Sequence, residues 1–199
     1  MDAQWMLVIG VALIAIILAA AVAWLYAKKL KSQRLKTKYG AEYDRTMQRL
    51  GSREAAEAEL EEREQRVKRF HIVPLSPQDR SHYYERWTAV QGRFVDDPRG
   101  AVQEAHELVH EVMKKRGYPV TDFEHSAANL SVEYPGVISH YRAASGIAES
   151  NRKGVAETEE LRQAVVNYRS LFDELLEVTE LTKEPRVQLK KVFRGGLRT

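Results

Sequence analysis

Hydrophobic residues are distributed unevenly along the chain, and its first part is one uninterrupted apolar stretch, Trp5 to Ala27. At a rise of 1.5 Å per residue, a helix of this stretch extends about 34 Å, enough to cross a hydrocarbon core of roughly 30 Å. Trp24 and Tyr26 stand at the end of the stretch, where aromatic rings prefer the level of the lipid headgroups. We therefore predict a single transmembrane helix, the anchor, within residues 1–27.

A run of positive charge follows the apolar stretch and predicts the orientation of the anchor. It contains six cations and no acidic residue: Lys28, Lys29, Lys31, Arg34, Lys36 and Lys38. By the positive-inside rule, the N-terminus lies outside and residues 28–199 lie in the cytoplasm of a single-pass protein of the plasma membrane. The same six cations are expected to contact anionic lipid headgroups.

A cleaved signal peptide is the alternative interpretation of the apolar stretch, because Ala19-Ala20-Ala21 resembles a small-residue cleavage site. Two features favour the anchor. No basic segment precedes the stretch, and the stretch is longer than the 7–15 apolar residues of a typical signal peptide.

Residues 28–70 are polar and have a helical spacing, with a thin apolar stripe that recurs mostly every four residues: Leu30, Leu35, Tyr39, Tyr43, Met47 and Leu50. Gly40 weakens the helix, and Gly51-Ser52 indicates a break, with Ser52 capping the next start. The segment predicts a long, charged juxtamembrane helix, and we prefer a solvated spacer to a self-associating stalk because apolar residues are sparse.

From Ser76 onward, apolar residues recur every three or four positions, as in amphipathic helices. Helix starts are predicted at capping residues Ser76, Asp97, Thr121 and Thr158. The best-defined apolar face is the one formed by Ala101, Val102, Ala105, Leu108, Val109, Val112 and Met113.

No stretch alternates apolar and polar residues for long enough to indicate a strand, so the fold class is all-α. We predict a compact helical bundle at residues 76–179 and a disordered basic tail at 180–199. Leu108 should be buried in this bundle, facing the helices that carry Trp87 and Phe172.

Composition changes this picture little. The chain has no cysteine, so it has no disulfide framework and no thiolate metal site. The net charge of +3 conceals an acidic middle between two basic arms. An acidic body argues against that body lying on an anionic membrane or on nucleic acid, whereas the basic arms could bind either. No nucleic-acid partner is expected.

One motif requires weighing as a catalytic site. His106, Glu107 and His110 match the H-E-x-x-H pattern of zinc peptidases, in which two imidazoles one helical turn apart share a metal and the glutamate is the general base. The helical phase places the histidines from the edge of the apolar face toward solvent, and Glu107 on the far side. The expectation is two exposed histidines without metal, because no third ligand is marked; nominal candidates are Glu124, His125, Glu133 and His140.

Three segments resemble a known family: Trp87–Val90, Arg93–Pro98 and Arg116-Gly117-Tyr118-Pro119. They are similar to an uncharacterised family of bacterial single-pass membrane proteins of actinobacterial type with a cytoplasmic helical domain. The resemblance implies a membrane-anchored helical protein and implies no activity, cofactor or catalytic residue.

These observations predict a membrane-anchored, non-enzymatic helical interaction or scaffold module that faces the cytoplasm and binds an unidentified protein partner. The sequence predicts no catalytic, cofactor-binding or metal-ligating residue for it. One alternative is a membrane-anchored zinc hydrolase that uses the motif at 106–110. Another is a module that holds a small apolar ligand between its helices.

Overall fold

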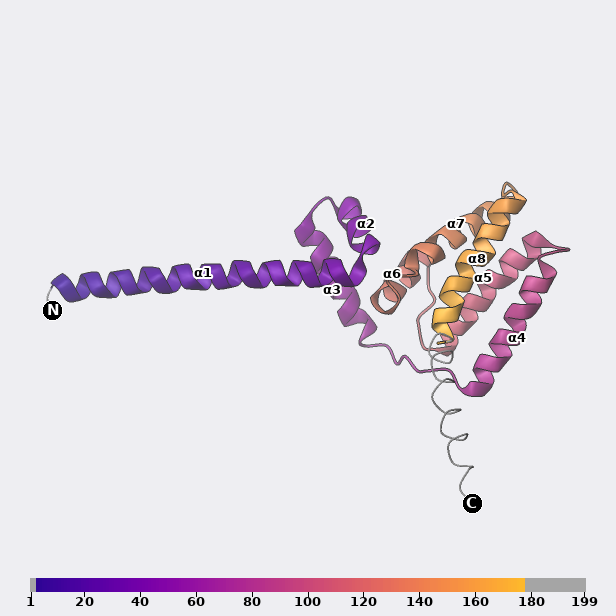
Figure 1. Cartoon of the computed structure of the whole chain (residues 1–199), viewed down its shortest axis with the longest axis horizontal. Helices are drawn as coiled ribbons and strands as arrows, with labels where there is room; N and C mark the ends of the chain where they lie inside the picture. The colour runs from indigo at the N-terminus through magenta and orange to yellow at the C-terminus, as the bar shows by residue number, and fades with distance from the viewer. Residues whose placement is uncertain (1–2, 178–199) are drawn as a thin grey trace, which may run out of the picture. The chain divides into compact units, whose positions relative to one another are not determined.

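The computed structural model describes residues 3–177, which form eight helices and no strand (Figure 1). The prediction of an all-α protein is confirmed. The predicted tail at 180–199 lies outside the described residues. The helices are α1 (Ala3–Tyr39), α2 (Ala41–Leu50), α3 (Arg53–Val67), α4 (Pro77–Arg93), α5 (Pro98–Lys115), α6 (Phe123–Glu133), α7 (Ile138–Arg152) and α8 (Thr158–Leu175).

The chain divides after Leu60 into two compact units, the N-terminal unit and the C-terminal unit. Helix α1 is long and apolar enough to cross a membrane. Its large apolar side chains from Leu13 to Tyr26 are 56–66% exposed, and they occur on all sides of the helix. The helix continues without a break through the six cations to Tyr39.

The rest of the N-terminal unit is divided at the two glycines where the sequence indicated a weakened helix and a break. Gly40 and Gly51 have φ angles of 50° and 72°, which an L side chain rarely adopts, and each glycine ends a helix. The predicted cap is confirmed, since Ser52 Oγ accepts the amide of Ala55 at 3.2 Å. The two turns bring three helices together.

A small core forms where these three helices meet. Leu35, Tyr39 and Tyr43 of the apolar stripe are buried with Leu60, and Met47 packs against them. A stripe of about one apolar residue per turn is too thin to be covered in a straight, solvated helix. Folding the segment back on itself covers that stripe.

Helices α4 to α8 of the C-terminal unit enclose one core, to which each contributes an apolar face. Leu108 is fully buried in it, as predicted. The rings of Trp87 and Phe172 stack there with centroids 4.6 Å apart. Helix α5 therefore lies where the sequence placed it, with α8 and α4 as neighbours.

Two of the four predicted helix starts are confirmed at the expected residue. Ser76 accepts the amide of Asp79 at 3.0 Å, and Asp97 accepts the amide of Gly100 at 2.9 Å. The other two caps are one residue away from the expected ones. Asp122 caps α6, because its carboxylate accepts the amide of His125, and Glu157 caps α8.

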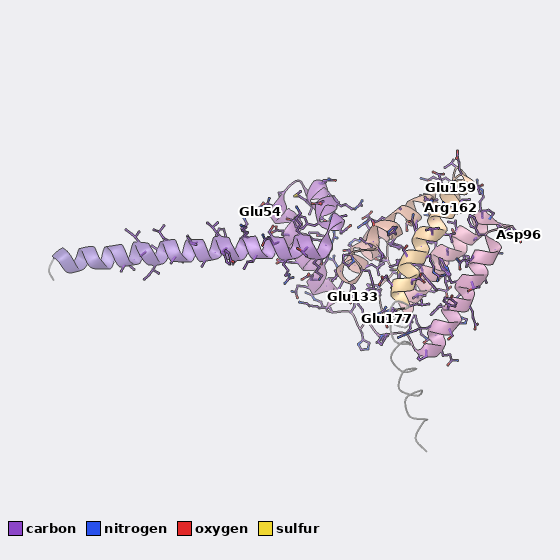
Figure 2. The ribbon with its side chains drawn as sticks, in the orientation of Figure 1. Glu54, Asp96, Glu133, Glu159, Arg162 and Glu177 are labelled. Atoms are coloured by element: carbon purple, nitrogen blue, oxygen red, sulfur yellow. The ribbon has the colours of Figure 1, made fainter. Side chains whose placement is uncertain are left out.

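A buried arginine closes one end of the C-terminal unit. Arg116 donates to the Tyr134 hydroxyl at 2.7 Å, the Leu175 carbonyl at 2.9 Å and Glu177 at 3.1 Å. Arg80 donates to the other oxygen of Glu177 at 3.1 Å. Glu177 lies at the opposite end of the unit from the Glu159–Arg162 ion pair (Figure 2). The arginine pair therefore fastens the end of α8 to the ends of α4 and α5.

We predict that Leu108→Ala lowers the free energy of unfolding of the C-terminal unit by roughly 2–5 kcal/mol, because the truncated side chain leaves a cavity in a filled core. Chemical denaturation followed by circular dichroism measures the change. Val166→Ala, at a half-exposed position of α8, is the control and should change the value by less than about 0.5 kcal/mol. Similar values for the two variants would contradict the assigned core.

Candidate functional site

The six cations predicted to contact lipid headgroups all lie on the last turns of α1, and all six are exposed. The six cations differ in whether they line a pocket. Lys28, Lys29 and Lys36 line a pocket of about 470 Å³, and Lys28 and Lys31 line a second one of about 390 Å³. Arg34 and Lys38 line neither pocket.

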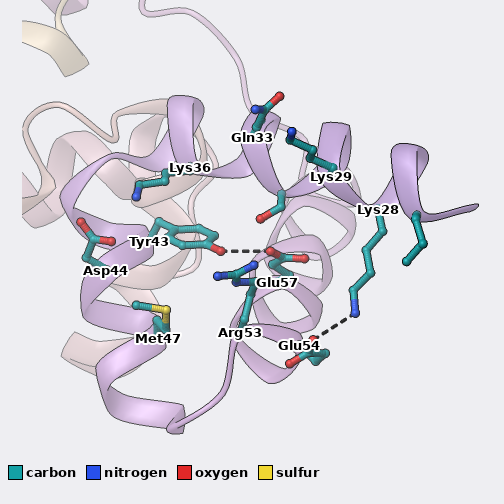
Figure 3. Close-up of a pocket in the computed structure, with 12 residues that line it drawn as sticks. Lys28, Lys29, Gln33, Lys36, Tyr43, Asp44, Met47, Arg53, Glu54 and Glu57 are labelled. Atoms are coloured by element: carbon teal, nitrogen blue, oxygen red, sulfur yellow. Dashed lines mark hydrogen bonds and ion pairs between the residues drawn. The ribbon is translucent and has the colours of Figure 1, made fainter. Parts of the chain in front are cut away.

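The larger pocket, called here the juxtamembrane pocket, lies between α1, α2 and the start of α3 (Figure 3). Its lining is mixed, with two apolar side chains, four cations and three carboxylates among the residues. The full lining is Leu25, Lys28, Lys29, Ser32, Gln33, Lys36, Tyr43, Asp44, Met47, Arg53, Glu54 and Glu57. The pocket thus combines groups that attract an anion with groups that accept hydrogen bonds.

An ion pair joins the beginning of α3 to the first cation of α1. Lys28 Nζ lies 3.0 Å from Glu54 Oε1, and this hydrogen bond lowers the pKa of Glu54. Both side chains are exposed, so the pair contributes little to stability. It shows that the first turn of α3 lies at the level of Lys28, just beyond the apolar stretch.

A buried carboxylate forms the inner wall of the pocket. Glu57 and Tyr43 are almost fully buried, and the Tyr43 hydroxyl donates to Glu57 Oε1 at 2.9 Å. A buried carboxylate is costly without such a donor. The bond therefore fixes the Glu57 side chain and orients it within the pocket.

Sequence reasoning missed the contribution of α2 and α3 to this site, namely Tyr43, Asp44, Arg53, Glu54 and Glu57. The spacing of Gly40 and Gly51 could have indicated this contribution, because the two glycines mark a short helix between two turns. The helix between them, α2, is about 15 Å long. Beyond the second glycine, α3 begins at the level of Lys28, as the ion pair between Lys28 and Glu54 shows.

The zinc-peptidase motif lies elsewhere, on α5, and the expectation of two exposed histidines is wrong. His106 and His110 are half-buried, with ring centroids 4.1 Å apart. His106 Nδ1 is 2.7 Å from the Tyr168 hydroxyl, and His110 Nε2 is 2.9 Å from the Tyr141 hydroxyl. The flank of α5 is covered because α7 and α8 place these tyrosines over it.

The remaining parts of the motif do not converge. Glu107 is exposed, as expected, and accepts a hydrogen bond from Gln103. Within residues 3–177, no three histidine, aspartate or glutamate side chains are grouped closely enough to hold a metal. The nominal third ligands have other partners: Glu124 pairs with Arg142, His125 with Asp122, Glu133 with Tyr118 and His140 with Asn167.

Burial favours the neutral form of both histidines. It lowers the pKa of His106, and it lowers the pKa of His110 to about 4, with His106 and Lys114 adding repulsion. The pair is therefore a neutral, hydrogen-bonded element between α5, α7 and α8 at neutral pH.

No protein-family model, curated protein or solved structure matches the chain. The resemblance of residues 87–119 to bacterial single-pass proteins therefore stays a prediction that depends on those segments alone.

We predict that His110 makes the protein less stable in mild acid. Its folded-state pKa of about 4 lies below the unfolded value of about 6.5, so the unfolded chain binds more protons between these values. Its contribution is complete above pH 6.5 and is lost as the pH falls toward 4. After allowance for partial solvent screening, the loss is on the order of 1 kcal/mol.

The measurement is the free energy of unfolding at pH 7 and pH 5 for the parent, His110→Gln and His82→Gln. The His110 variant should be less stable at pH 7 and should lose less stability on acidification. The variant at exposed His82 should follow the parent at both pH values. Identical pH dependence in all three proteins would contradict the assignment.

Proposed function

We propose that the chain is a single-pass protein of the plasma membrane, with its N-terminus outside and residues 28–199 in the cytoplasm. In this proposal it is a non-enzymatic helical module that contacts anionic lipid through α1 and binds a protein partner through the C-terminal unit. The zinc hydrolase remains the alternative, but no grouping of ligands in residues 3–177 favours it.

The observation that carries the proposal is the exposed apolar surface of α1. Its large side chains from Leu13 to Tyr26 are more than half exposed in every direction around the helix. Each aliphatic side chain of this size gains about 1.5–3 kcal/mol on leaving water, so the uncovered helix costs well over 10 kcal/mol in total. A bilayer is the environment that removes this cost.

The basic turns of α1 support the orientation and the lipid contact. Positive charge directly after a span favours the cytoplasmic side. Each cation near an anionic surface contributes on the order of 1 kcal/mol of attraction, which falls off within a Debye length.

The C-terminal unit supports the interaction role by its construction. Its core is filled by apolar faces from α4 to α8, and its helix ends are capped by Ser76, Asp97 and Asp122. A unit with a packed core and capped helices suits recognition of another protein, because its surface residues are held in place before binding.

The topology yields a direct prediction. A reporter that works only in the cytoplasm should be active when fused after Thr199. A reporter that works only outside the cytoplasm should be inactive in the same position. A reporter placed before Trp5 should give the opposite result. Extracytoplasmic activity of the C-terminal fusion, or a mature chain that begins near Val22, would overturn the proposed orientation.

The lipid contact yields another. A peptide of residues 28–50 should bind vesicles that contain anionic lipid and should dissociate between 0.1 and 1 M salt, as the Debye length shortens from about 10 to about 3 Å. Cosedimentation measures the bound fraction. Equal binding to neutral vesicles would leave the six cations as determinants of topology alone.

The protein partner is tested by truncation. Affinity purification of the detergent-extracted full chain, followed by mass spectrometry, should recover a protein that a chain ending after Leu60 does not recover. The truncated chain keeps the anchor and the cations, so it controls for nonspecific membrane capture. Recovery of the same proteins by both chains would contradict a binding role for the C-terminal unit.

A further inference from the structure

The juxtamembrane pocket begins at the boundary between the apolar and the basic parts of α1. Leu25, at one end of its lining, belongs to the apolar stretch, and Lys36, at the other end, lies about 16 Å further along the helix axis. If α1 crosses the bilayer as proposed, this interval coincides with the headgroup region. The pocket therefore opens where a phospholipid headgroup lies, and the inference that follows rests on the proposed function.

Three cations of the lining form no ion pair with any side chain that the structure describes. Lys28 is paired with Glu54, but among residues 12–177 no ion pair involves Lys29, Lys36 or Arg53. Two of these lie on α1 and one begins α3, so they approach the pocket from two helices (Figure 3). Lysine and arginine together are the usual ligands of a phosphate group.

The carboxylates narrow the choice of ligand. Asp44 and the buried Glu57 also line the pocket and repel a bare anion, but each accepts hydrogen bonds from hydroxyl groups. A ligand that carries one phosphate together with hydroxyls satisfies both sets of groups. A volume of about 470 Å³ lies within the range of small-molecule sites.

We propose that the juxtamembrane pocket binds the headgroup of one hydroxylated anionic phospholipid, of the phosphatidylglycerol or phosphatidylinositol class. Lys29, Lys36 and Arg53 hold the phosphate, and Asp44 and Glu57 accept hydrogen bonds from the headgroup hydroxyls. Leu25 contacts the first methylenes of an acyl chain that continues along the exposed apolar face of α1. A diffuse basic surface attracts any anionic lipid. This site would also distinguish lipids by their headgroup hydroxyls.

Native mass spectrometry of the full chain in detergent micelles tests this site. With added phosphatidylglycerol, the parent should retain one lipid per chain, and it should retain phosphatidylcholine at least tenfold less. Lys29→Gln/Lys36→Gln should weaken phosphatidylglycerol retention about tenfold. Arg45→Gln/Arg49→Gln removes the same charge from α2 outside the lining, and it should change retention less than about twofold.

A second comparison tests recognition of the hydroxyls. Asp44→Ala, which removes the acceptor, should weaken retention of phosphatidylglycerol and should leave phosphatidic acid, which lacks headgroup hydroxyls, unaffected or better retained. Asp44 is exposed, so the substitution should preserve the helical circular dichroism spectrum, which is measured for every variant.

Several results would overturn the proposal. Equal losses in the two double variants would indicate diffuse attraction, and equal retention of phosphatidic acid and phosphatidylglycerol by the parent would exclude hydroxyl recognition. Tight retention of phosphatidylethanolamine would assign the carboxylates to an ammonium group. Displacement of the lipid by millimolar inorganic phosphate would identify a site for free phosphate. Each of these results leaves the orientation of α1 and its proposed membrane anchoring intact.

Discussion

The exposed apolar surface of α1 is the constraint on which the rest of the structure depends. Among the described residues, the large apolar side chains from Leu13 to Tyr26 are more than half exposed. The cations, the turn at Gly40 and the small core around Leu35 all follow directly after this surface ends. The juxtamembrane pocket is held at a fixed position next to that surface, and this position determines which ligands its charged side chains can reach.

The two units solve the problem of burial in different ways. The C-terminal unit has broad apolar faces, and its helices cover them mutually around Trp87, Leu108 and Phe172. The polar part of the N-terminal unit has only a thin stripe, which it covers by turning twice within a short length of chain. Because this part of the unit has few apolar residues to bury, polar side chains of α1, α2 and α3 face one another. They line the juxtamembrane pocket with lysines and carboxylates.

Local signals made much of the fold predictable. The apolar stretch, the caps at Ser76 and Asp97 and the face around Leu108 each depend on residues close in sequence. The pocket was not predictable in this way, because Glu54 and Lys28 meet only through the combined geometry of two turns. The histidines of α5 were misplaced for a similar reason, since helical phase describes one helix and Tyr141 and Tyr168 arrive from two others.

The continuity of α1 from its apolar part to Tyr39 has a mechanical consequence. With no hinge between Leu25 and Leu35, the helix transmits any tilt of its apolar part directly to α2 and to the start of α3, which pack against its end. A thinner bilayer makes a long apolar helix tilt. If α1 spans a bilayer as proposed, the N-terminal unit would lean with it, bringing one wall of the pocket nearer to the bilayer and lifting the other away. Bilayer thickness would thereby alter which side of the unit meets the lipid.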